Sequence, residues 1–474
     1  MNFHRESFAI FFLAVLALHY LNLPWKLRKF NLLLCSYIFY AAWEPVFCFL
    51  IVFSTIVDWF AARKMYYSES MSVRRLWLGI SLCANLGLLS YFKYGQFLYD
   101  NLAPWLAREF SPTDWGITLP VGISFYTFQT LSYSFDAYRR KAEPWHDFID
   151  YALYVTFFPQ LVAGPIVRST DFLPQCLEPK RANAAQLSWG MSLVLLGIFE
   201  KVVIADGLLA PISERVFNGS VPTSAIQSWV GVFAFAMQIF GDFAGYSTAA
   251  IGIAMCLGFK FQDNFRFPYG AIGFSDFWQR WHISLSSWLR DYLYIPLGGN
   301  RRGSARMFIN LMITMLLGGL WHGADWKFVA WGALHGVFLI VERILKSLFG
   351  RLKIWSTLIG RIGLMLATFA SICVTWVFFR GQDFPWSLAY VRTMFLGGNG
   401  ESTESLANIK ATEQALVLGI TLGILAVHWC LRDTSLEDAA KSVPWWIRSV
   451  LLSAMIIAIV TMSGDDRAFI YFQF

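Results

Sequence analysis

Apolar runs recur along almost the whole chain and are separated by short polar connections. The apolar residues follow one another without alternating with polar ones, so the pattern predicts helices and not the strands of a membrane barrel. A helix needs about 20 residues to cross the hydrocarbon layer. We therefore expect an all-α polytopic membrane protein. The predicted spans cover residues 8–24, 30–43, 46–62, 76–93, 116–136, 148–164, 187–205, 228–258, 307–341, 358–380, 413–431 and 445–462.

These runs differ in length, and this limits how many of them cross the membrane as single helices. The runs 228–258 and 307–341 are long enough to hold more than one element. Short or Gly/Pro-interrupted runs predict re-entrant or broken segments, which are tolerated only when buried in protein or lining a cavity. We expect about eleven transmembrane helices plus re-entrant or interfacial ones. No linker is long enough to separate soluble domains, so residues 1–474 predict one membrane domain.

Composition and charge agree with this class. Only 15% of the 474 residues are charged, against about 25% in soluble domains. The formal net charge of +7 comes from Lys and Arg in short connections, as in cytoplasmic loops. No soluble element carries a basic face with interleaved aromatic residues, so we expect membrane lipids and not nucleic acid as partners.

The basic connections also predict an orientation. Lys26 and Arg28 follow the first predicted span, Arg63 and Lys64 the third, and Arg139 the fifth. Odd-numbered spans then end in the cytoplasm, which places the N-terminus outside, in the periplasm of a bacterium with an inner membrane.

Several kinds of chemistry are not indicated by the sequence. The seven cysteines form no CxxC pair, so neither a zinc site nor a disulfide framework is predicted. The HExxH, P-loop and GxSxG motifs are absent, which excludes the simplest zinc protease, NTPase and hydrolase candidates. We expect no metal and no permanently bound cofactor.

The first candidate site lies in residues 274–302, where His282 follows Trp281. In a continuous helix, Arg280 would lie across from an aromatic stripe, and such a helix with basic ends is typical of the membrane interface. That interpretation does not require a histidine, so His282 remains a functional candidate. The stripe would consist of Trp278, Trp281, Leu285, Trp288, Leu289 and Tyr292.

The second candidate is His322, which lies in an apolar run between glycines, in Leu317-Gly-Gly-Leu-Trp-His-Gly-Ala-Asp-Trp326. An imidazole is costly in a bilayer and therefore needs a reason. It serves as an inter-helix hydrogen-bond partner, as a general base towards an attacking hydroxyl, or as part of a proton relay in a transporter. The spacing leaves these alternatives open.

Two further polar residues lie at membrane depth. His335 follows His322 by thirteen residues, about 20 Å if one straight helix joins them, and we interpret it as packing or supporting. Asp242, in the run 228–258, predicts a pairing with Arg or His from another element or a role in shaping the site.

At these residues the chain resembles the membrane-bound O-acyltransferase (MBOAT) family, in its bacterial branch of alginate O-acetylation and teichoic-acid D-alanylation. The ending Phe469-Ile-Tyr-Phe-Gln-Phe474 favours the alginate type. The pattern Asp-Phe-Ser-Gly-Tyr-Ser-Asp of the family departs here at Ala244 and Thr248, which puts a role for its last acid in doubt. The matching segments are 119–129, 158–168, 241–269, 277–303, 317–326 and 469–474.

The resemblance implies a fold around a central tunnel, a catalytic histidine at His322 and a second functional histidine at His282. His322 would act as general base, while His282 would orient it or stabilise the oxyanion. The remaining residues expected to bind substrate or line the tunnel are Asp242, Tyr246, Arg280, Trp281, Trp288, Asp291 and Trp321.

The implied function is an inner-membrane O-acetyltransferase that passes acetyl from cytoplasmic acetyl-CoA towards an exported polysaccharide of the alginate or cellulose type. The immediate acceptor is either the sugar or a serine of a periplasmic O-acetyltransferase partner. Two alternatives stay open. One is a transporter or channel with a histidine proton relay, and the other is D-alanyl transfer from a carrier protein to a cell-wall polymer.

Overall fold

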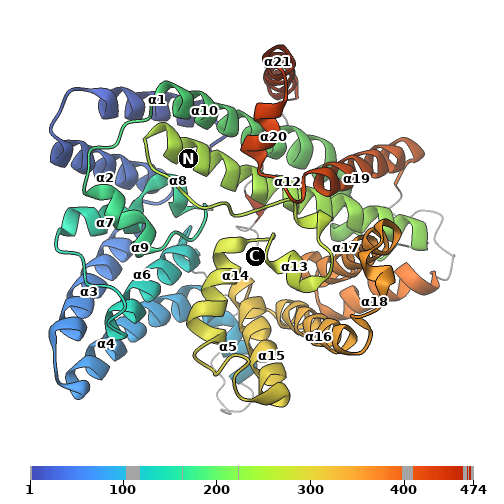
Figure 1. The fold of residues 1–474 in the computed structure, drawn as a ribbon, viewed down its shortest axis with the longest axis horizontal. Helices are drawn as coiled ribbons and strands as arrows, with labels where there is room; N and C mark the ends of the chain where they lie inside the picture. Colours follow the sequence, from blue (N-terminus) through green and yellow to red (C-terminus); the bar gives the residue numbers. More distant parts are fainter. Residues whose placement is uncertain are drawn as a thin grey trace. The chain divides into compact units, whose positions relative to one another are not determined.

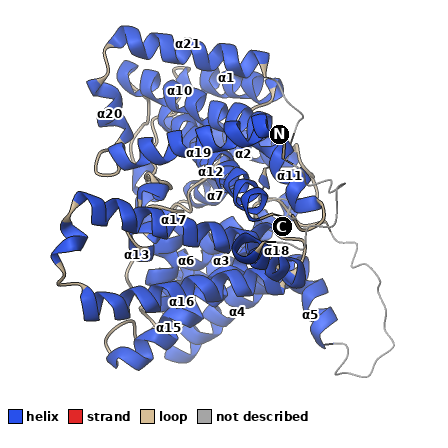
Figure 2. Cartoon of the chain, turned by 90° about the vertical axis from the view of Figure 1, so that its right-hand side faces the viewer, coloured by secondary structure: helices blue, strands red, loops and turns tan. Residues whose placement is uncertain are grey.

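The apolar runs form helices. The computed structural model describes residues 3–102, 118–162, 164–222, 224–397, 409–462, 467, 469 and 470. Within those residues the chain consists of helices and loops without a strand (Figure 2). This confirms the all-α prediction.

The chain divides into two compact units, with boundaries within α10, within α12 and in the loop that follows α12. Unit 1 comprises Met1–Val194 and Tyr246–Gln262, and unit 2 comprises Leu195–Gly245 and Asp263–Phe474. The single membrane domain stays a prediction.

Within its described residues, unit 1 consists of helices and the loops between them (Figure 1). Its helices are α1 Glu6–Tyr20, α2 Trp25–Ala41, α3 Phe47–Tyr67, α4 Met71–Leu89, α5 Gly95–Leu102, α6 Ile123–Tyr138, α7 Phe148–Thr156, α8 Phe158–Leu161, α9 Ser169–Phe172, and parts of α10 Ala184–Phe199 and α12 Ala225–Cys256.

Both histidine motifs belong to unit 2. Its further elements are the π-helix Glu200–Leu209, α11 Ala210–Asn218, α13 Phe274–Trp278, α14 Ile283–Leu289, the π-helix Arg290–Tyr294, α15 Gly303–His322, α16 Trp326–Phe349, α17 Leu358–Arg380, α18 Phe384–Leu396, α19 Ala411–Leu431, α20 Leu436–Ser442 and α21 Trp445–Thr461.

Six helices within the described residues are long and apolar enough to cross a membrane, and a seventh span results if α20 and α21, bent by 119°, are taken together. The predicted total of about eleven crossings therefore stays a prediction. The first is Met71–Leu102, in which the π-helix Ser90–Tyr94 joins α4 to α5. The other five are Ala225–Cys256, Gly303–His322, Trp326–Phe349, Leu358–Arg380 and Ala411–Leu431.

The two long predicted runs behave differently. The run 228–258 lies in one 32-residue helix, α12, whereas the run 307–341 is divided between α15 and α16. The division follows from local chemistry, because α15 ends before Gly323 and the Asp325 side chain caps α16 by accepting from the backbone N–H of Lys327 at 2.9 Å. The two helices lie side by side (Figure 1).

Two other predicted elements are also interrupted. The run 148–164 is broken at Phe157, between α7 and the four-residue α8, which contains Pro159. The continuous helix considered for residues 274–292 is wrong, since α13 ends at Trp278 and α14 begins at Ile283. The predicted aromatic stripe is therefore divided. Trp278 lies in α13, Trp281 in the break, Leu285, Trp288 and Leu289 in α14, and Tyr292 in the π-helix Arg290–Tyr294.

Candidate active site

His322 is the last residue of α15 and is 4% exposed. Two glycines let α15 approach α16 closely. A Cβ at Gly319 would overlap the backbone oxygen of Phe328, and one at Gly332 would overlap that of Met315. This close approach sets the first turns of α16 beside the end of α15.

Aromatic rings surround the imidazole of His322. Its ring centre lies 5.0 Å from that of Trp321, 5.0 Å from that of Trp331 and 5.3 Å from that of Phe379. All three rings meet it edge to face, with interplanar angles of 78°, 80° and 71°. Such a setting contains little water, and electrostatic interactions inside it are stronger than in solution.

His282 lies in the break between α13 and α14 and is fully buried. Its backbone is left-handed, with φ 45° and ψ 53°, a conformation that is uncommon for a residue with a side chain. Asn264 holds this turn, because its backbone oxygen accepts from Ile283 N at 2.9 Å and its side-chain oxygen accepts from Ser284 Oγ at 2.8 Å.

The same amide oxygen determines the tautomer of His282. Asn264 Oδ1 lies 3.1 Å from His282 Nδ1 and also accepts from the backbone N–H of Ser284, which identifies it as an oxygen. Since a carbonyl oxygen only accepts, Nδ1 carries the proton and Nε2 the lone pair. Burial lowers the pKa of His282 to about 3, so the ring is neutral near pH 7. A neutral ring of this tautomer accepts at Nε2, which disfavours the oxyanion-donor alternative.

Trp321 connects the two histidines. Its ring centre lies 6.1 Å from that of His282 and 5.0 Å from that of His322. Phe243, on α12, packs on the other side of the His282 ring at 4.7 Å. The two motifs, forty residues apart, thus meet in one aromatic cluster of unit 2.

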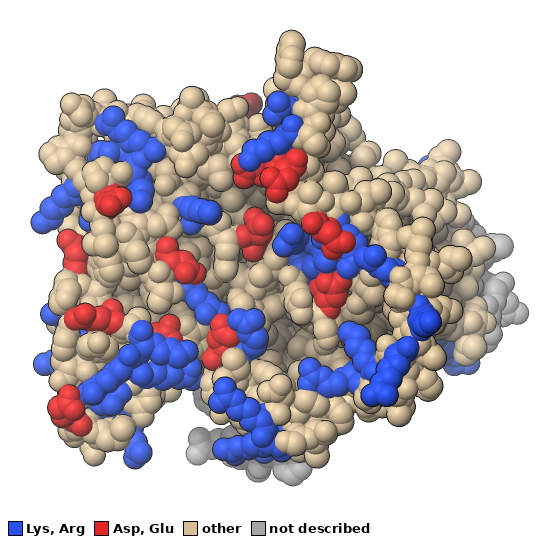
Figure 3. Space-filling view, viewed as in Figure 1, with Lys and Arg blue, Asp and Glu red and all other residues tan. Residues whose placement is uncertain are grey.

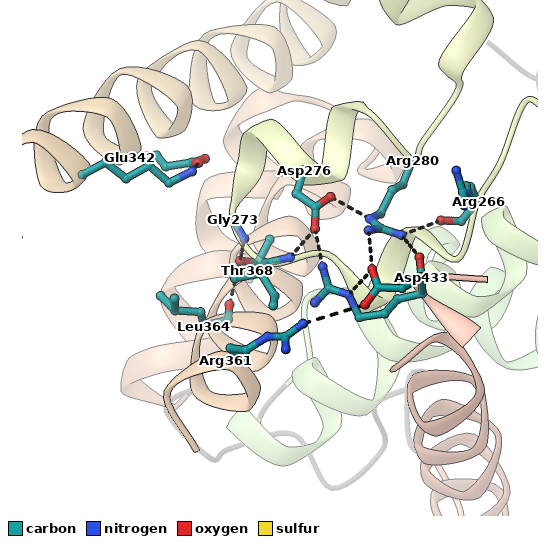
Figure 4. Close-up of polar contacts among 12 residues, drawn as sticks. Arg266, Gly273, Asp276, Arg280, Glu342, Arg361, Leu364, Thr368 and Asp433 are labelled. Carbon is teal, nitrogen blue, oxygen red and sulfur yellow. Dashed lines mark hydrogen bonds and ion pairs between the residues drawn. The ribbon is translucent and has the colours of Figure 1, made fainter. Parts of the chain in front are cut away.

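Arg280 lies in a network of polar contacts (Figure 4). Its Nε donates to Asp276 at 2.7 Å, and its Nη1 donates to the backbone oxygen of Arg432 at 2.6 Å. Trp281, two residues before Ile283, is 1% exposed and stacks on Phe277 at 5.7 Å. These contacts fix the segment that carries His282.

Trp288 and Asp291 lie further along the same segment. Trp288 is buried and packs on Tyr292 at 5.2 Å. Asp291 accepts from Arg290 Nε at 2.7 Å and from Nη2 at 3.2 Å. Their predicted binding roles stay proposals.

Asp242 has a different partner from the predicted Arg or His. It forms a buried ion pair with Lys201, which lies in the π-helix Glu200–Leu209. Lys201 also forms an ion pair with Asp206 at 3.0 Å. The backbone N–H of Ile470 donates to Asp242 at 2.7 Å. Asp242 therefore ties the backbone at Ile470 to α12. Tyr246 belongs to unit 1, where it stacks on Phe3 at 4.2 Å.

His335 is closer to the cluster than a straight helix predicts, because the chain turns back between α15 and α16. Its ring centre is 4.5 Å from that of Trp331, which also contacts His322. Its Nε2 lies 3.1 Å from Thr375 Oγ1 on α17. This hydrogen bond supports the interpretation of His335 as a packing or supporting residue.

Comparison with known proteins identifies the family. A profile of the MBOAT, membrane-bound O-acyltransferase family, matches residues 122–374. The chain belongs to the MBOAT family. It is an O-acyltransferase of the membrane, which confirms the enzyme class expected from the motifs.

Curated relatives are similar over most of their length. The chain is 38% identical to the "Probable alginate O-acetylase AlgI" of Azotobacter vinelandii, over 84% of this chain and 79% of that protein. It is 34% identical to the protein of the same name in Pseudomonas putida, over 100% of both chains. It is 33% identical to the "Peptidoglycan O-acetyltransferase" of Helicobacter pylori, over 94% and 91%.

Three residues of or near this candidate site were not found from the sequence. Asn264 lies in a polar loop and its importance comes only from contacts with residues 282–284. Trp331 resembles any other aromatic residue of an apolar helix, although its ring contacts both His322 and His335. Lys201 carried one usable signal, a lysine inside an apolar run, since a buried cation requires an anionic partner.

Proposed function

We propose that this MBOAT protein is an inner-membrane O-acetyltransferase that passes acetyl from acetyl-CoA towards an exported polysaccharide. The observation that carries the proposal is the single aromatic cluster containing His282, Trp321 and His322. The similarity to proteins named alginate O-acetylase and peptidoglycan O-acetyltransferase supports acetyl as the group and a polysaccharide as the final acceptor. The inner membrane and a periplasmic N-terminus belong to the same proposal.

The proposed step is an acyl transfer with His322 as general base. The imidazole of His322 takes the proton of an acceptor hydroxyl while its oxygen attacks the thioester carbonyl. The C–O bond forms, the C–S bond breaks, and the proton passes from the imidazolium to the leaving thiolate of CoA. The hydroxyl belongs to a sugar or to a serine of a periplasmic partner enzyme.

His282 serves as a positioning residue in this proposal. Its neutral ring, with Nδ1–H bonded to Asn264, presents a lone pair at Nε2. That nitrogen accepts a hydrogen bond from the acceptor hydroxyl or from a water beside it. The proposal also includes a tunnel that admits donor and acceptor from opposite sides of the membrane. It further includes substrate-binding or tunnel-lining roles for Asp242, Tyr246, Arg280, Trp281, Trp288 and Asp291.

The test is His322→Ala in the full-length protein, with His146→Ala as the control because the side chain of His146 is 72% exposed. Both variants are checked for membrane insertion, and the cells are analysed for polysaccharide acetyl esters. We expect His322→Ala to lower acetylation at least about 100-fold and the control to match the wild type. Undiminished acetylation in His322→Ala overturns the assignment.

A second measurement separates the alternatives. Purified protein is incubated with labelled acetyl-CoA and an acceptor, and CoA release is measured. Release that depends on His322 supports the enzyme, whereas transport without release supports a channel or transporter. Transfer from D-alanyl carrier protein in place of acetyl-CoA would assign the protein to polymer D-alanylation.

A further inference from the structure

Three arginines of unit 2 converge on one carboxylate (Figure 4). Asp433 lies 3.8 Å from Arg280, 3.8 Å from Arg361 and 3.5 Å from Arg432. These are ion-pair distances and exceed ordinary hydrogen-bond lengths. The Asp433 side chain is 70% exposed. We refer to Arg280, Arg361 and Arg432 as the arginine cluster; its central carboxylate is loosely held.

The arginine cluster is held in place by its surroundings. Asp276 accepts from Arg280 Nε at 2.7 Å and from Arg432 Nη2 at 3.1 Å. The guanidinium carbons of Arg361 and Arg432 lie over the ring of Trp429, at 5.7 and 5.5 Å from its centre. The cation–π contacts with Trp429 and the carboxylate of Asp276 therefore fix the positions of the guanidinium groups before a ligand binds.

The cluster retains unused hydrogen-bonding capacity. Arg432 is 9% exposed, and its Nη1 is buried without an acceptor among the described residues. A buried donor left in that state is costly. The three guanidinium groups face two carboxylates, Asp276 and Asp433, so one positive charge remains. A ligand with several anionic oxygens would accept a hydrogen bond from Arg432 Nη1 and would balance the remaining positive charge.

The arginine cluster lies at the end of α15, α16, α17 and α19 where most of their basic residues gather. Arg361 is in the first turn of α17, and Arg432 directly follows α19. The positive-inside rule places this end in the cytoplasm. On the face drawn in Figure 3, basic side chains are interspersed with acidic ones. Around this end of α15, α16, α17 and α19 lie Arg301, Arg302, Arg306, Arg343, Lys346, Arg351, Lys353, Arg361 and Arg432, whereas Lys327, Arg380 and Lys410 lie at the opposite ends.

We propose that the arginine cluster binds the phosphate groups of a soluble acyl donor at the cytoplasmic end of unit 2, with Asp433 as the carboxylate that the phosphate displaces. Guanidinium forks match phosphate oxygens, and Arg280 is two residues from His282, so the same segment joins the two sites. The inference rests on the proposed function for the identity of the donor.

The test uses the full-length protein in nanodiscs and two donors. Acetyl-CoA carries phosphates, and S-acetylpantetheine carries none. We expect Arg361→Gln to raise the KM for acetyl-CoA about tenfold and to leave kcat/KM for S-acetylpantetheine within about twofold. Asp433→Asn, which removes the competing carboxylate, lowers the KM for acetyl-CoA. Arg351→Gln, an exposed arginine at the same end, is the control and matches the wild type.

Direct binding separates this inference from the catalytic assignment. Calorimetric titration of CoA into the His322→Ala protein needs no turnover, and the added Arg361→Gln change is expected to weaken CoA binding about tenfold. Equal CoA affinity with and without Arg361, or equal effects on both donors, overturns the inference. It is also overturned if the effect of Arg361→Gln occurs only in nanodiscs containing phosphatidylglycerol, because the cluster would then bind lipid headgroups. Suppose that the added Arg361→Gln change weakens CoA binding but His322→Ala alone retains acetyl transfer. That result would contradict only the assignment of His322 as the base and would leave the inference about the arginine cluster intact.

Discussion

At the scale of single residues, the chemistry of His282 depends on one backbone angle and one amide oxygen. The left-handed turn at φ 45° directs the chain into α14, and Asn264 fixes the protonated nitrogen of the ring. Neither feature is visible in the local sequence, because Asn264 precedes His282 by eighteen residues. The sequence identifies the histidine, and the contact determines that it accepts at Nε2.

Burial of His282 predicts a pH dependence of stability. Its pKa is lowered from 6.5 to about 3 by burial. Between these values the unfolded state binds the proton and the folded state does not, so stability falls as the pH decreases from 6.5 towards 3. The expected slope from this group is about 1.4 kcal/mol per pH unit.

The measurement compares the unfolding temperature of the wild type and of His282→Asn in detergent at pH 7 and pH 5. Asparagine tolerates the left-handed conformation and does not titrate in this range. We expect the wild type to lose more stability than the variant on acidification. Parallel pH dependences of the two proteins would contradict a neutral buried imidazole.

At the scale of elements, α15 and α16 form the support of the site. The sequence predicted one long run over 307–341, and the structure divides it into two packed helices. The division brings Trp331 and His335 back towards His322, which a straight helix would not. The capping Asp325 and the glycines near the break are present in the sequence, but their effect depends on the packing of α16 against α15.

The close approach of α15 and α16 gives a second prediction. Gly332→Ala places a methyl group against the backbone oxygen of Met315 and forces the helices apart. We expect a loss of about 1–3 kcal/mol of stability from overpacking and reduced acetyl transfer, since Trp331 moves relative to His322. Thermal unfolding and CoA release measure the two effects.

Gly363→Ala on α17 is the matched control, because a Cβ there has nothing within 4 Å. It is expected to unfold and to turn over as the wild type does. Equal behaviour of the two alanine variants would show that the close approach is not required.

At the scale of the whole molecule, charge distribution predicts how unit 2 is oriented. The basic ends of α15–α17 and α19 are expected in the cytoplasm and the ends near Lys327 and Lys410 outside. In a cysteine-free background, Lys353→Cys should be labelled by a membrane-impermeant maleimide only in inside-out vesicles, and Lys410→Cys only in intact cells. The reverse pattern would contradict both the orientation and cytoplasmic access to the arginine cluster.

Recognition of the family also belongs to this scale. Six segments between residues 119 and 474 resembled the MBOAT pattern. The profile match over residues 122–374 confirms the family. The number of crossings could not be obtained in the same way. Helices such as α6 and α7 are too short to qualify as spans by length, and the length of an apolar run does not tell where a helix breaks.

The sequence by itself determined the helical membrane class, the family and the two candidate histidines, because apolar runs and local motifs are properties of short segments. Only the tertiary structure decided which groups meet: His282 with Asn264, Asp242 with Lys201, and Arg432 with Asp276. These partners are separated by 18, 41 and 156 positions. A polar group in a water-poor interior must find a partner, but which one it finds depends on how distant helices pack.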